Sequence, residues 1–217
     1  MEDSLALREE VIRACRWLEQ RSLVIGTWGN LSVRLGDRIL VTPSRVSYQV
    51  MKPEDMVIID LEGRVVQGHR PPTSEREVHR LLYRKRPDIG AIVHCHSEYA
   101  CAVSSSGRSI PPLIEEMSQL LGGGIPCTRT YVPAGRHLEL GQEASETIGG
   151  GNALLLRNHG PVCCGRDLDE ALLVCLVVEK AAKIYLSLSP RLPLRPIPEQ
   201  FVEQERTRFL YRYGKEE

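Results

Sequence analysis

The sequence predicts an α/β fold in one domain spanning residues 1–217. Three observations support this prediction. A chain of 217 residues is long enough for one large domain with a substantial core. Apolar residues recur at helical spacing over residues 4–21 and 167–186. Short apolar runs next to glycine or turn residues, at 89–93 and 153–156, are typical of buried strands.

Composition excludes several functional classes. Lys+Arg and Asp+Glu each total 28, so no global basic field points to nucleic acid. No apolar run approaches the roughly 20 residues of a membrane span, and Met1-Glu2-Asp3 begins no signal peptide. The seven cysteines form no C-x-x-C motif, which favours reduced thiols over a disulfide framework. We therefore expect a cytoplasmic protein without nucleic-acid or membrane partners.

The first third of the chain predicts one helix followed by short strands. Ser4 can cap a helix that continues to about Arg21. The segment 26–33 is a glycine-containing turn that enters an apolar alternation, and asparagine and glycine in it can offer donors to an anion. An ordinary turn before a strand explains the same residues. Strands are then predicted at 38–42 and, as a hairpin, at 57–66.

A second helix is predicted between Pro71 and Pro87. Thr73 or Ser74 is a natural N-cap, and free N–H groups at such an end attract phosphate. Glu75 lies in the predicted first turn. Its carboxylate either complements the helix dipole or is placed at a metal or reacting carbon, and both interpretations remain open.

The histidines at the ends of two apolar strands suggest a metal site. His94 and His96 stand two residues apart, so in a strand both imidazoles would point to one face. His159 follows the apolar run 153–156 and supplies a third imidazole. Three imidazoles with an open fourth position are typical of catalytic zinc, although strand-end histidines can also be simple hydrogen-bonding groups. The other histidines are assigned to surface or helix-packing positions: His69, His79 and His137.

The second half adds further helices and strands. The segment 113–121 carries Glu115-Glu116 among apolar residues, and Gly122-Gly123-Gly124 ends it before strand-like residues 125–127. Helices are predicted at 137–148, at 167–186 and, as a charged amphipathic segment, at 198–212.

Five ordered motifs carry a family resemblance. Along nearly its whole length the chain resembles the class II aldolase/adducin-head family, most closely its fuculose-phosphate aldolase branch. The resemblance implies a three-layer fold with a central, mainly antiparallel sheet flanked by helices. It also implies a homotetramer with active sites at subunit interfaces. The motifs are Gly29-Asn30-Leu31-Ser32, Thr42-Pro43-Ser44, Thr73-Ser74-Glu75, His94-Cys95-His96 and Asn158-His159-Gly160.

The same resemblance implies roles for individual residues. Glu75 matches a carboxylate that completes the metal shell and acts as acid/base. Tyr213 matches, on a short segment, a tyrosine that protonates or steadies the aldehyde oxygen. The implied ligands of one Zn²⁺ per chain are His94, His96, His159 and Glu75. The implied phosphate-binding residues are Gly29, Asn30, Ser44, Thr73 and Ser74.

These roles imply a zinc-dependent aldolase that cleaves a ketose 1-phosphate to dihydroxyacetone phosphate and an aldehyde. Two departures alter the pattern: Arg45 replaces a glycine and Glu115 a tyrosine of the fuculose-phosphate branch. In addition, Glu115-Glu116-Met117 resembles a Gln-Glu-Met stretch of the 5-methylthioribulose-1-phosphate dehydratases, where the glutamate is the catalytic base, and a solvated helix charge explains Glu116 equally well. Substrates resembling fuculose, 5-deoxyribulose or 5-methylthioribulose 1-phosphate all fit. Alternatives are such a dehydratase, a ribulose-phosphate 4-epimerase, or a non-catalytic adducin-head-like interaction module.

Overall fold

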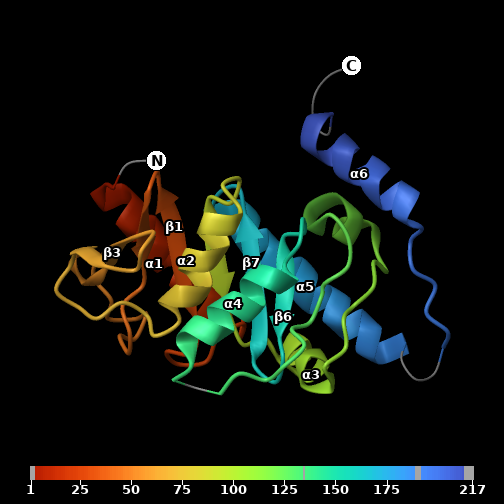
Figure 1. Ribbon diagram of the computed structural model, residues 1–217, viewed down its shortest axis with the longest axis horizontal. Helices are drawn as coiled ribbons and strands as arrows, with labels where there is room; N and C mark the ends of the chain where they lie inside the picture. The colour runs from red at the N-terminus through yellow and green to blue at the C-terminus, as the bar shows by residue number, and fades with distance from the viewer. Residues whose placement is uncertain (1–2, 134, 189–191, 213–217) are drawn as a thin grey trace.

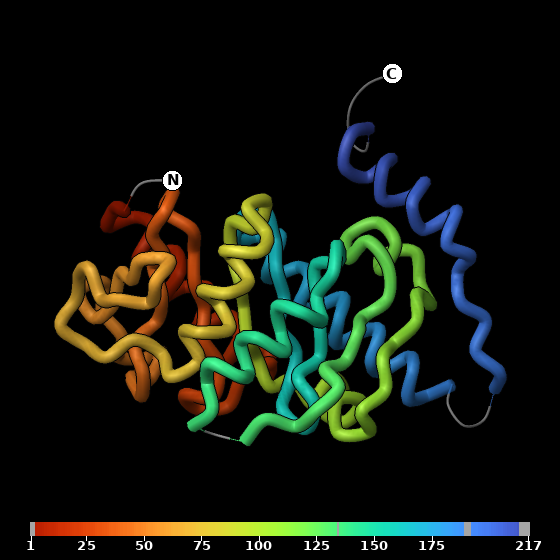
Figure 2. Tube along the Cα trace, in the orientation of Figure 1, coloured from red at the N-terminus to blue at the C-terminus, as the bar shows by residue number. Residues whose placement is uncertain are grey.

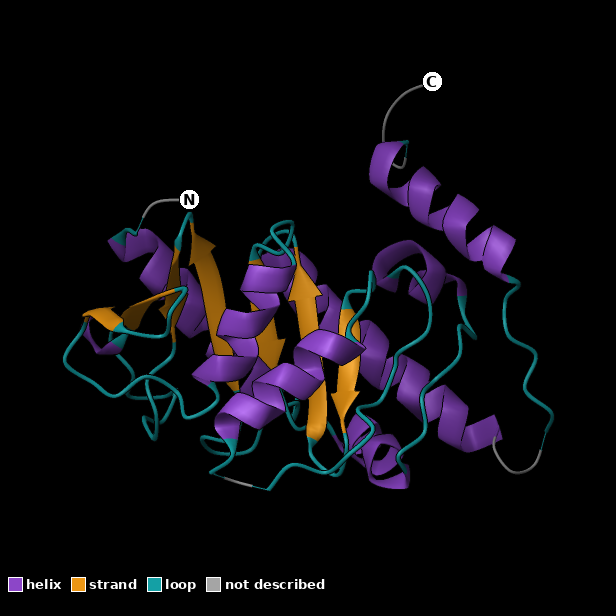
Figure 3. Cartoon of the chain, in the orientation of Figure 1, coloured by secondary structure: helices purple, strands orange, loops and turns teal. Residues whose placement is uncertain are grey.

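A seven-stranded sheet forms the centre of the molecule (Figure 3). The computed structural model describes residues 3–133, 135–188 and 192–212. All neighbouring strands pair antiparallel, in the order β4-β3-β2-β1-β5-β7-β6. The strands are β1 (Asn30–Leu35), β2 (Arg38–Val41), β3 (Val57–Asp60), β4 (Val65–Gln67), β5 (Ala91–His94), β6 (Ala153–Leu156) and β7 (Gly160–Gly165).

Helices cover both faces of the sheet and make three layers (Figure 1). On one face, residues of α1 (Leu5–Gln20), α3 (Glu98–Ser106) and α5 (Leu168–Leu188) share one apolar core with the sheet. On the other face, α2 (Arg76–Lys85) and α4 (His137–Thr147) form a second core. The expected α/β fold, with a central antiparallel sheet flanked by helices, is confirmed.

The alternation of side chains in β1 and β5 places polar groups beneath α2. Leu31 and Val33 of β1 enter the core shared with α1, α3 and α5. Asn30 and Ser32 therefore point to the opposite face, where α2 covers them, because successive strand residues alternate between faces. Asn30 pairs with His94 in the register between β1 and β5. The end of β5 and the start of β1 thus meet at one edge of the sheet.

Several element boundaries differ from the sequence-based expectation. The strand β5 ends at His94, so His96 lies just beyond it. The strand-like segment 125–127 makes only isolated bridges, from Ile125 and Cys127. The strand β7 was not predicted, because it begins with Gly160-Pro161, residues that usually mark a turn. The helix α1 is capped by Ser4, whose Oγ accepts a hydrogen bond from the Leu7 N–H at 3.2 Å, as expected.

The last helix, α6 (Glu199–Tyr211), lies apart from the sheet layers (Figure 2). It packs on the short, wide-turned helix η2 (Met117–Leu121), where Arg206 Nη1 donates to the carbonyls of Gln119 and Leu120 at 2.8 and 2.6 Å. A short 3₁₀ turn, η1 (Pro53–Asp55), precedes β3. Among the described residues, no helix combines the length and apolarity needed to cross a membrane.

Candidate metal centre and active site

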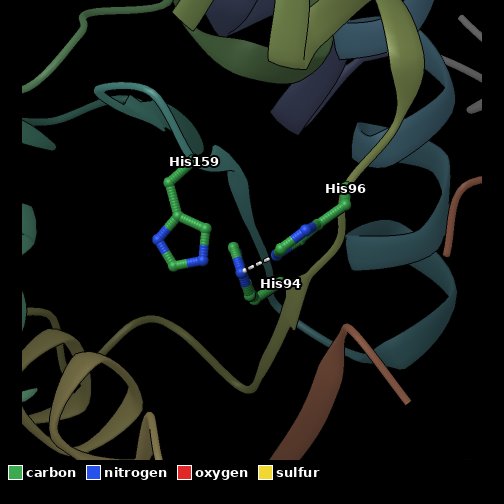
Figure 4. A group of neighbouring side chains, drawn as sticks. All are labelled: His94, His96 and His159. Carbon is green, nitrogen blue, oxygen red and sulfur yellow. Dashed lines mark hydrogen bonds between the residues drawn. The ribbon is translucent and has the colours of Figure 1, made fainter. Parts of the chain in front are cut away.

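Three imidazole rings face one another at the edge of the sheet (Figure 4). The ring centroids of His94, His96 and His159 lie 4.8–4.9 Å apart in all three pairs. The Nε2 atoms of His94 and His96 are 3.0 Å apart. One nitrogen from each of the three rings falls within 4.8 Å of the others. The structure therefore brings together the three histidines that the sequence singled out.

Backbone geometry produces this convergence. His94 is the last residue of β5, and His159 lies in the turn between β6 and β7. Asn158 occupies the left-handed region at φ 57°, a conformation that asparagine tolerates better than most residues. Gly160 follows, and a Cβ there would lie 2.5 Å from the Cys95 carbonyl oxygen. The glycine permits the turn to approach the segment that carries His96.

The protonation of the rings suits metal binding. Nδ1 of His94 lies 2.9 Å from the Pro161 carbonyl oxygen, which can only accept a hydrogen bond. Nδ1 is therefore the protonated nitrogen, and Nε2 presents its lone pair to the cluster. Burial, with the neighbouring His94 and His159, lowers the pKa of His96 to about 4. Burial also lowers the pKa of His94, so both rings are neutral near pH 7.

The carboxylate of Glu75 completes the cluster. Its Oε2 lies 3.3 Å from His94 Nε2 and its Oε1 lies 3.1 Å from His159 Nε2. Burial would raise the pKa of Glu75, but His94, His159 and the Asn30 hydrogen bond outweigh it and hold the pKa well below its usual range. Neighbouring ligands of a tetrahedral zinc with bonds of about 2.0–2.1 Å lie about 3.3 Å apart. The donor set, three imidazoles and one carboxylate, fits such an ion.

A cavity of about 280 Å³ opens beside the cluster. Its lining includes Glu75, His96 and His159. It also includes every residue that the family resemblance assigned to phosphate: Gly29, Asn30, Ser44, Thr73 and Ser74. Thr27, Trp28, Pro43 and Arg45 complete the wall. Cluster and phosphate-binding candidates thus share one cavity.

Close packing around Gly29 leaves no room for a side chain at this position of the cavity wall. A Cβ on Gly29 would come within 2.5 Å of Val24 Cγ1 and 3.1 Å of the His94 carbonyl oxygen. The Tyr48 hydroxyl donates a hydrogen bond of 2.6 Å to the Gly29 carbonyl. Sequence reasoning did not identify Tyr48 as a support of this turn, because the two residues are distant in sequence.

The start of α2 borders the cavity. The helix begins at Arg76, so Glu75 is its N-cap residue and not part of the first turn as expected. Neither Thr73 nor Ser74 is the N-cap, but Thr73 Oγ1 accepts a hydrogen bond from the Glu75 N–H at 3.3 Å. Glu75 makes no side-chain capping hydrogen bond to the helix. Its carboxylate turns toward the imidazoles instead.

Arg45 combines an unusual backbone with a place in the cavity wall. Its φ is 60°, in the left-handed region that favours glycine. Its side chain is exposed and lines the cavity beside Ser44. Among the residues that line this cavity, Arg45 is the only arginine or lysine. Non-glycine residues in such conformations cost about 1–3 kcal/mol and cluster at functional sites.

Glu116 and its neighbour Glu115 lie away from the cavity. Glu116, a predicted catalytic residue, forms an ion pair with Lys180, is 44% exposed, and does not line the cavity. Glu115 lies 3.6 Å from Arg208 of α6 and is 64% exposed. Tyr213, the other catalytic candidate, falls outside the described residues.

His79 is a buried packing residue of α2, within the assignment to surface or helix packing, but its hydrogen bonds to β1 were not predicted. It is fully buried and bonds on both ring nitrogens, to Ser32 Oγ at 2.6 Å and to Asn30 Oδ1 at 2.5 Å. Asn30 Nδ2 in turn donates to Glu75 Oε2 at 2.8 Å. The signal in the sequence was the spacing of four residues between Glu75 and His79, which places both on one face of a helix.

Comparison with known proteins identifies the fold and the lineage. Residues 9–186 match the family model described as class II aldolase and adducin N-terminal domain. A solved L-fuculose 1-phosphate aldolase superposes with a TM-score of 0.91 at 30% identity, over 97% of this chain and 99% of that one.

Two further solved structures are similar over most of their length. YgbL from Escherichia coli, described as a candidate aldolase/epimerase/decarboxylase, matches with a TM-score of 0.79 at 30% identity, over 93% of this chain and 98% of that one. L-fuculose-1-phosphate aldolase from Thermus thermophilus matches with a TM-score of 0.70 at 28% identity, over 85% of this chain and 95% of that one.

Proposed function

The chain belongs to the class II aldolase and adducin N-terminal domain family, and we propose that it is a zinc-dependent aldolase acting on a ketose 1-phosphate. The products would be dihydroxyacetone phosphate and an aldehyde. The observation that carries the proposal is the position of Glu75. Its carboxylate contacts His94 and His159 and also lines a cavity rich in hydrogen-bond donors.

The proposed ligands of one zinc ion per chain are His94, His96, His159 and Glu75. When bound, the ion supplies Lewis-acid polarisation of the substrate carbonyl and stabilises negative charge that develops on the substrate oxygens. Three imidazoles are enough to hold the ion. Glu75 could therefore leave the ion and take up a proton.

Glu75 is the proposed acid/base. In cleavage, the C3–C4 bond breaks, the C4 hydroxyl gives its proton to the Glu75 carboxylate and becomes the aldehyde, and the bonding electrons remain on the C3 side. Glu75 then returns a proton to C3, which releases dihydroxyacetone phosphate. The carboxyl already lies at the wall of the cavity, so the transfer requires no rearrangement of α2. We propose Tyr213, on resemblance alone, as the partner of the aldehyde oxygen.

The phosphate end of the substrate is proposed to lie against Gly29, Ser44, Thr73 and Ser74, with Asn30 beside them. Their hydroxyl and N–H groups are neutral donors, and the charge-assisted bonds they make to phosphate are the stronger kind. Arg45 adds a cation at the same wall. Fixing the phosphate orients the reacting carbons, so binding energy remote from the chemistry contributes to the rate.

The wider organisation is proposed from the family. We infer a single-domain chain that assembles as a cytoplasmic homotetramer with active sites at subunit interfaces. The exposed side chains of Leu173 and Leu176, three residues apart on α5, support an apolar contact surface of this kind. Glu116 lies outside its own chain's cavity, so a role for it would require the cavity of a neighbouring subunit.

A ketose-1-phosphate panel tests the activity. We expect the purified protein to release dihydroxyacetone phosphate from at least one of fuculose, 5-deoxyribulose and 5-methylthioribulose 1-phosphate, as detected by a coupled reductase and by identification of the aldehyde. A diketone phosphate would instead identify a dehydratase, and an isomeric pentulose phosphate from ribulose 5-phosphate would identify an epimerase. Absence of turnover with all of them, in metal-replete protein, would favour the non-catalytic interaction module.

Ser44→Ala tests the phosphate site, because Ser44 lines the cavity. Among the described residues, its hydroxyl has no hydrogen-bond partner that the substitution would leave unpaired. Loss of one hydrogen bond to a charged group costs about 1.5–3 kcal/mol, so KM for the phosphorylated ketose should rise roughly 10- to 100-fold. KM for the unphosphorylated ketose should change little. Equal effects on the two substrates would refute the assignment. Asn30→Ala is a less specific probe, since Asn30 also bonds Glu75.

A further inference from the structure

A buried series of hydrogen bonds leads to Glu75 from beneath α2. The Tyr83 hydroxyl lies 3.0 Å from Ser32 Oγ, which lies 2.6 Å from His79 Nδ1. His79 Nε2 lies 2.5 Å from Asn30 Oδ1, and Asn30 Nδ2 donates to Glu75 Oε2 at 2.8 Å. His79 and Ser32 are fully buried, and Tyr83 is 1% exposed. Tyr83, Ser32 and His79 do not line the cavity, whereas Asn30 and Glu75 do.

Two sequence periodicities build this series. Glu75, His79 and Tyr83 recur every four residues along one face of α2 and its N-cap. Asn30 and Ser32 recur every two residues along one face of β1. Packing α2 over β1 interleaves the two sets, so each polar group meets its partner without leaving the interface. Polar groups buried this completely are costly unless each is satisfied, which makes their arrangement specific.

The bonds have a single consistent direction. Asn30 presents Oδ1 to His79, and an amide oxygen can only accept, so His79 Nε2 carries the proton. In the neutral ring Nδ1 is then an acceptor, and the Ser32 hydroxyl must donate to it. The Tyr83 hydroxyl lies 3.0 Å from both the Ser32 carbonyl oxygen and Ser32 Oγ, and each of these oxygens can accept its proton. Burial, with the nearby His94, lowers the pKa of His79 to about 3, which agrees with a neutral ring.

We propose that His79 is a positioning residue for Glu75, acting through the Asn30 amide. With Nε2–H bound to Oδ1, the amide can present only its NH₂ group to the Glu75 carboxylate. Without that bond the amide can rotate, and its oxygen would then face the carboxylate and repel it. The contribution of His79 to catalysis rests on the proposed function, whereas its effect on the geometry of Glu75 does not.

Two variants of His79 test the proposal: one removes the N–H that donates to Asn30, and the other replaces it with a different N–H donor. His79→Leu fills the space but offers no donor, and His79→Gln places an amide NH₂ near the former Nε2 position. His79→Leu should lower kcat or the affinity for Zn²⁺ by about 10- to 100-fold, the range for lost outer-shell partners of a metal site. His79→Gln should recover most of that loss. Zinc affinity is measured by chelator competition without substrate, so this readout remains decisive even if the protein proves not to be an aldolase.

A double variant separates positioning from general destabilisation. If His79 acts through Glu75, His79→Leu should change either readout by less than about twofold in a Glu75→Gln background, because the group it positions is already lost. Multiplication of the two losses would overturn the proposal. Tyr83→Phe is the matched control: it removes a buried hydroxyl from the far end and leaves the His79–Asn30–Glu75 bonds in place. An equally large loss from Tyr83→Phe would show that packing sets the effect.

The wild-type protein provides a test that needs no variant to fold. Nitrogen-15 NMR of histidine-labelled protein should show His79 as a neutral ring protonated at Nε2 and unprotonated at Nδ1. Protonation at Nδ1 would contradict the direction of the bonds and overturn the proposal. Ser32→Ala removes the donor to Nδ1 and should leave Nε2 protonated, because Asn30 Oδ1 still accepts from it.

Discussion

Replacing His94, His96 and His159 together with alanine should abolish stoichiometric metal binding. Elemental analysis of wild-type protein after mild purification should find about one divalent ion per chain, and His159→Ala alone should lose most of it. The physical reason is that each imidazole nitrogen faces the others across at most 4.8 Å, so removal of one leaves an incomplete shell. The triple variant should also lose the cleavage activity, which depends on the charge of the ion.

His69→Ala is the control for this experiment. His69 is 61% exposed, lies 3.7 Å from Asp55 and does not line the cavity, so its loss should leave the metal content unchanged. Full metal retention in the triple variant would eliminate the proposed site. Metal loss from His69→Ala as well would show that the assay detects destabilisation and not the loss of ligands.

The metal candidates were predictable because local patterns encode them. His94 and His96 are two residues apart after an apolar run, and His159 follows a second such run. Their convergence required that β5 and β6, which are both antiparallel to the intervening β7, end at the same edge of the sheet. Even so, His96 lies beyond the end of β5. The two rings still converge because backbone hydrogen bonds hold the segment past β5, from Cys95 N–H to the Pro161 carbonyl at 3.3 Å and from His96 N–H to the Leu23 carbonyl at 2.9 Å.

The features that the sequence did not predict depend on contacts between residues distant in the chain. His79 alone resembles a helix-packing residue, and its partners Ser32 and Asn30 are 47 and 49 residues away. Nothing local indicates that β1 lies under α2. The strand β7 was missed for a related reason: antiparallel pairing with β5 and β6 overrides the turn preference of Gly160-Pro161. Arg45 stood out as a departure from a family pattern, but only the structure revealed its left-handed backbone.

Glu75→Gln should lower carbon–carbon cleavage by roughly 10²–10⁴-fold, the contribution typical of a general acid or base. Glutamine keeps the shape of the side chain but cannot take up or return the proton. Zinc should remain near one ion per chain after mild purification, because three imidazoles still hold it, although its affinity should fall at least as far as in His79→Leu. The loss should therefore appear in kcat, with much smaller changes in metal content and in KM for the phosphorylated ketose.

Glu116→Gln is the matched substitution, and the two variants together distinguish the aldolase from the dehydratase. Glu116 pairs with Lys180 outside its own cavity, so its loss should alter mainly which aldehyde is accepted, with far less effect on the rate of cleavage. In a dehydratase the order reverses, since Glu116 would remove the proton next to the carbonyl and no dihydroxyacetone phosphate would form. A coupled assay for dihydroxyacetone phosphate on wild type and both variants measures the order directly. A dominant effect of Glu116→Gln, without that product from any ketose 1-phosphate, would overturn the aldolase. We expect Glu75 to dominate, because of the two carboxylates only that of Glu75 contacts both the imidazoles and the cavity.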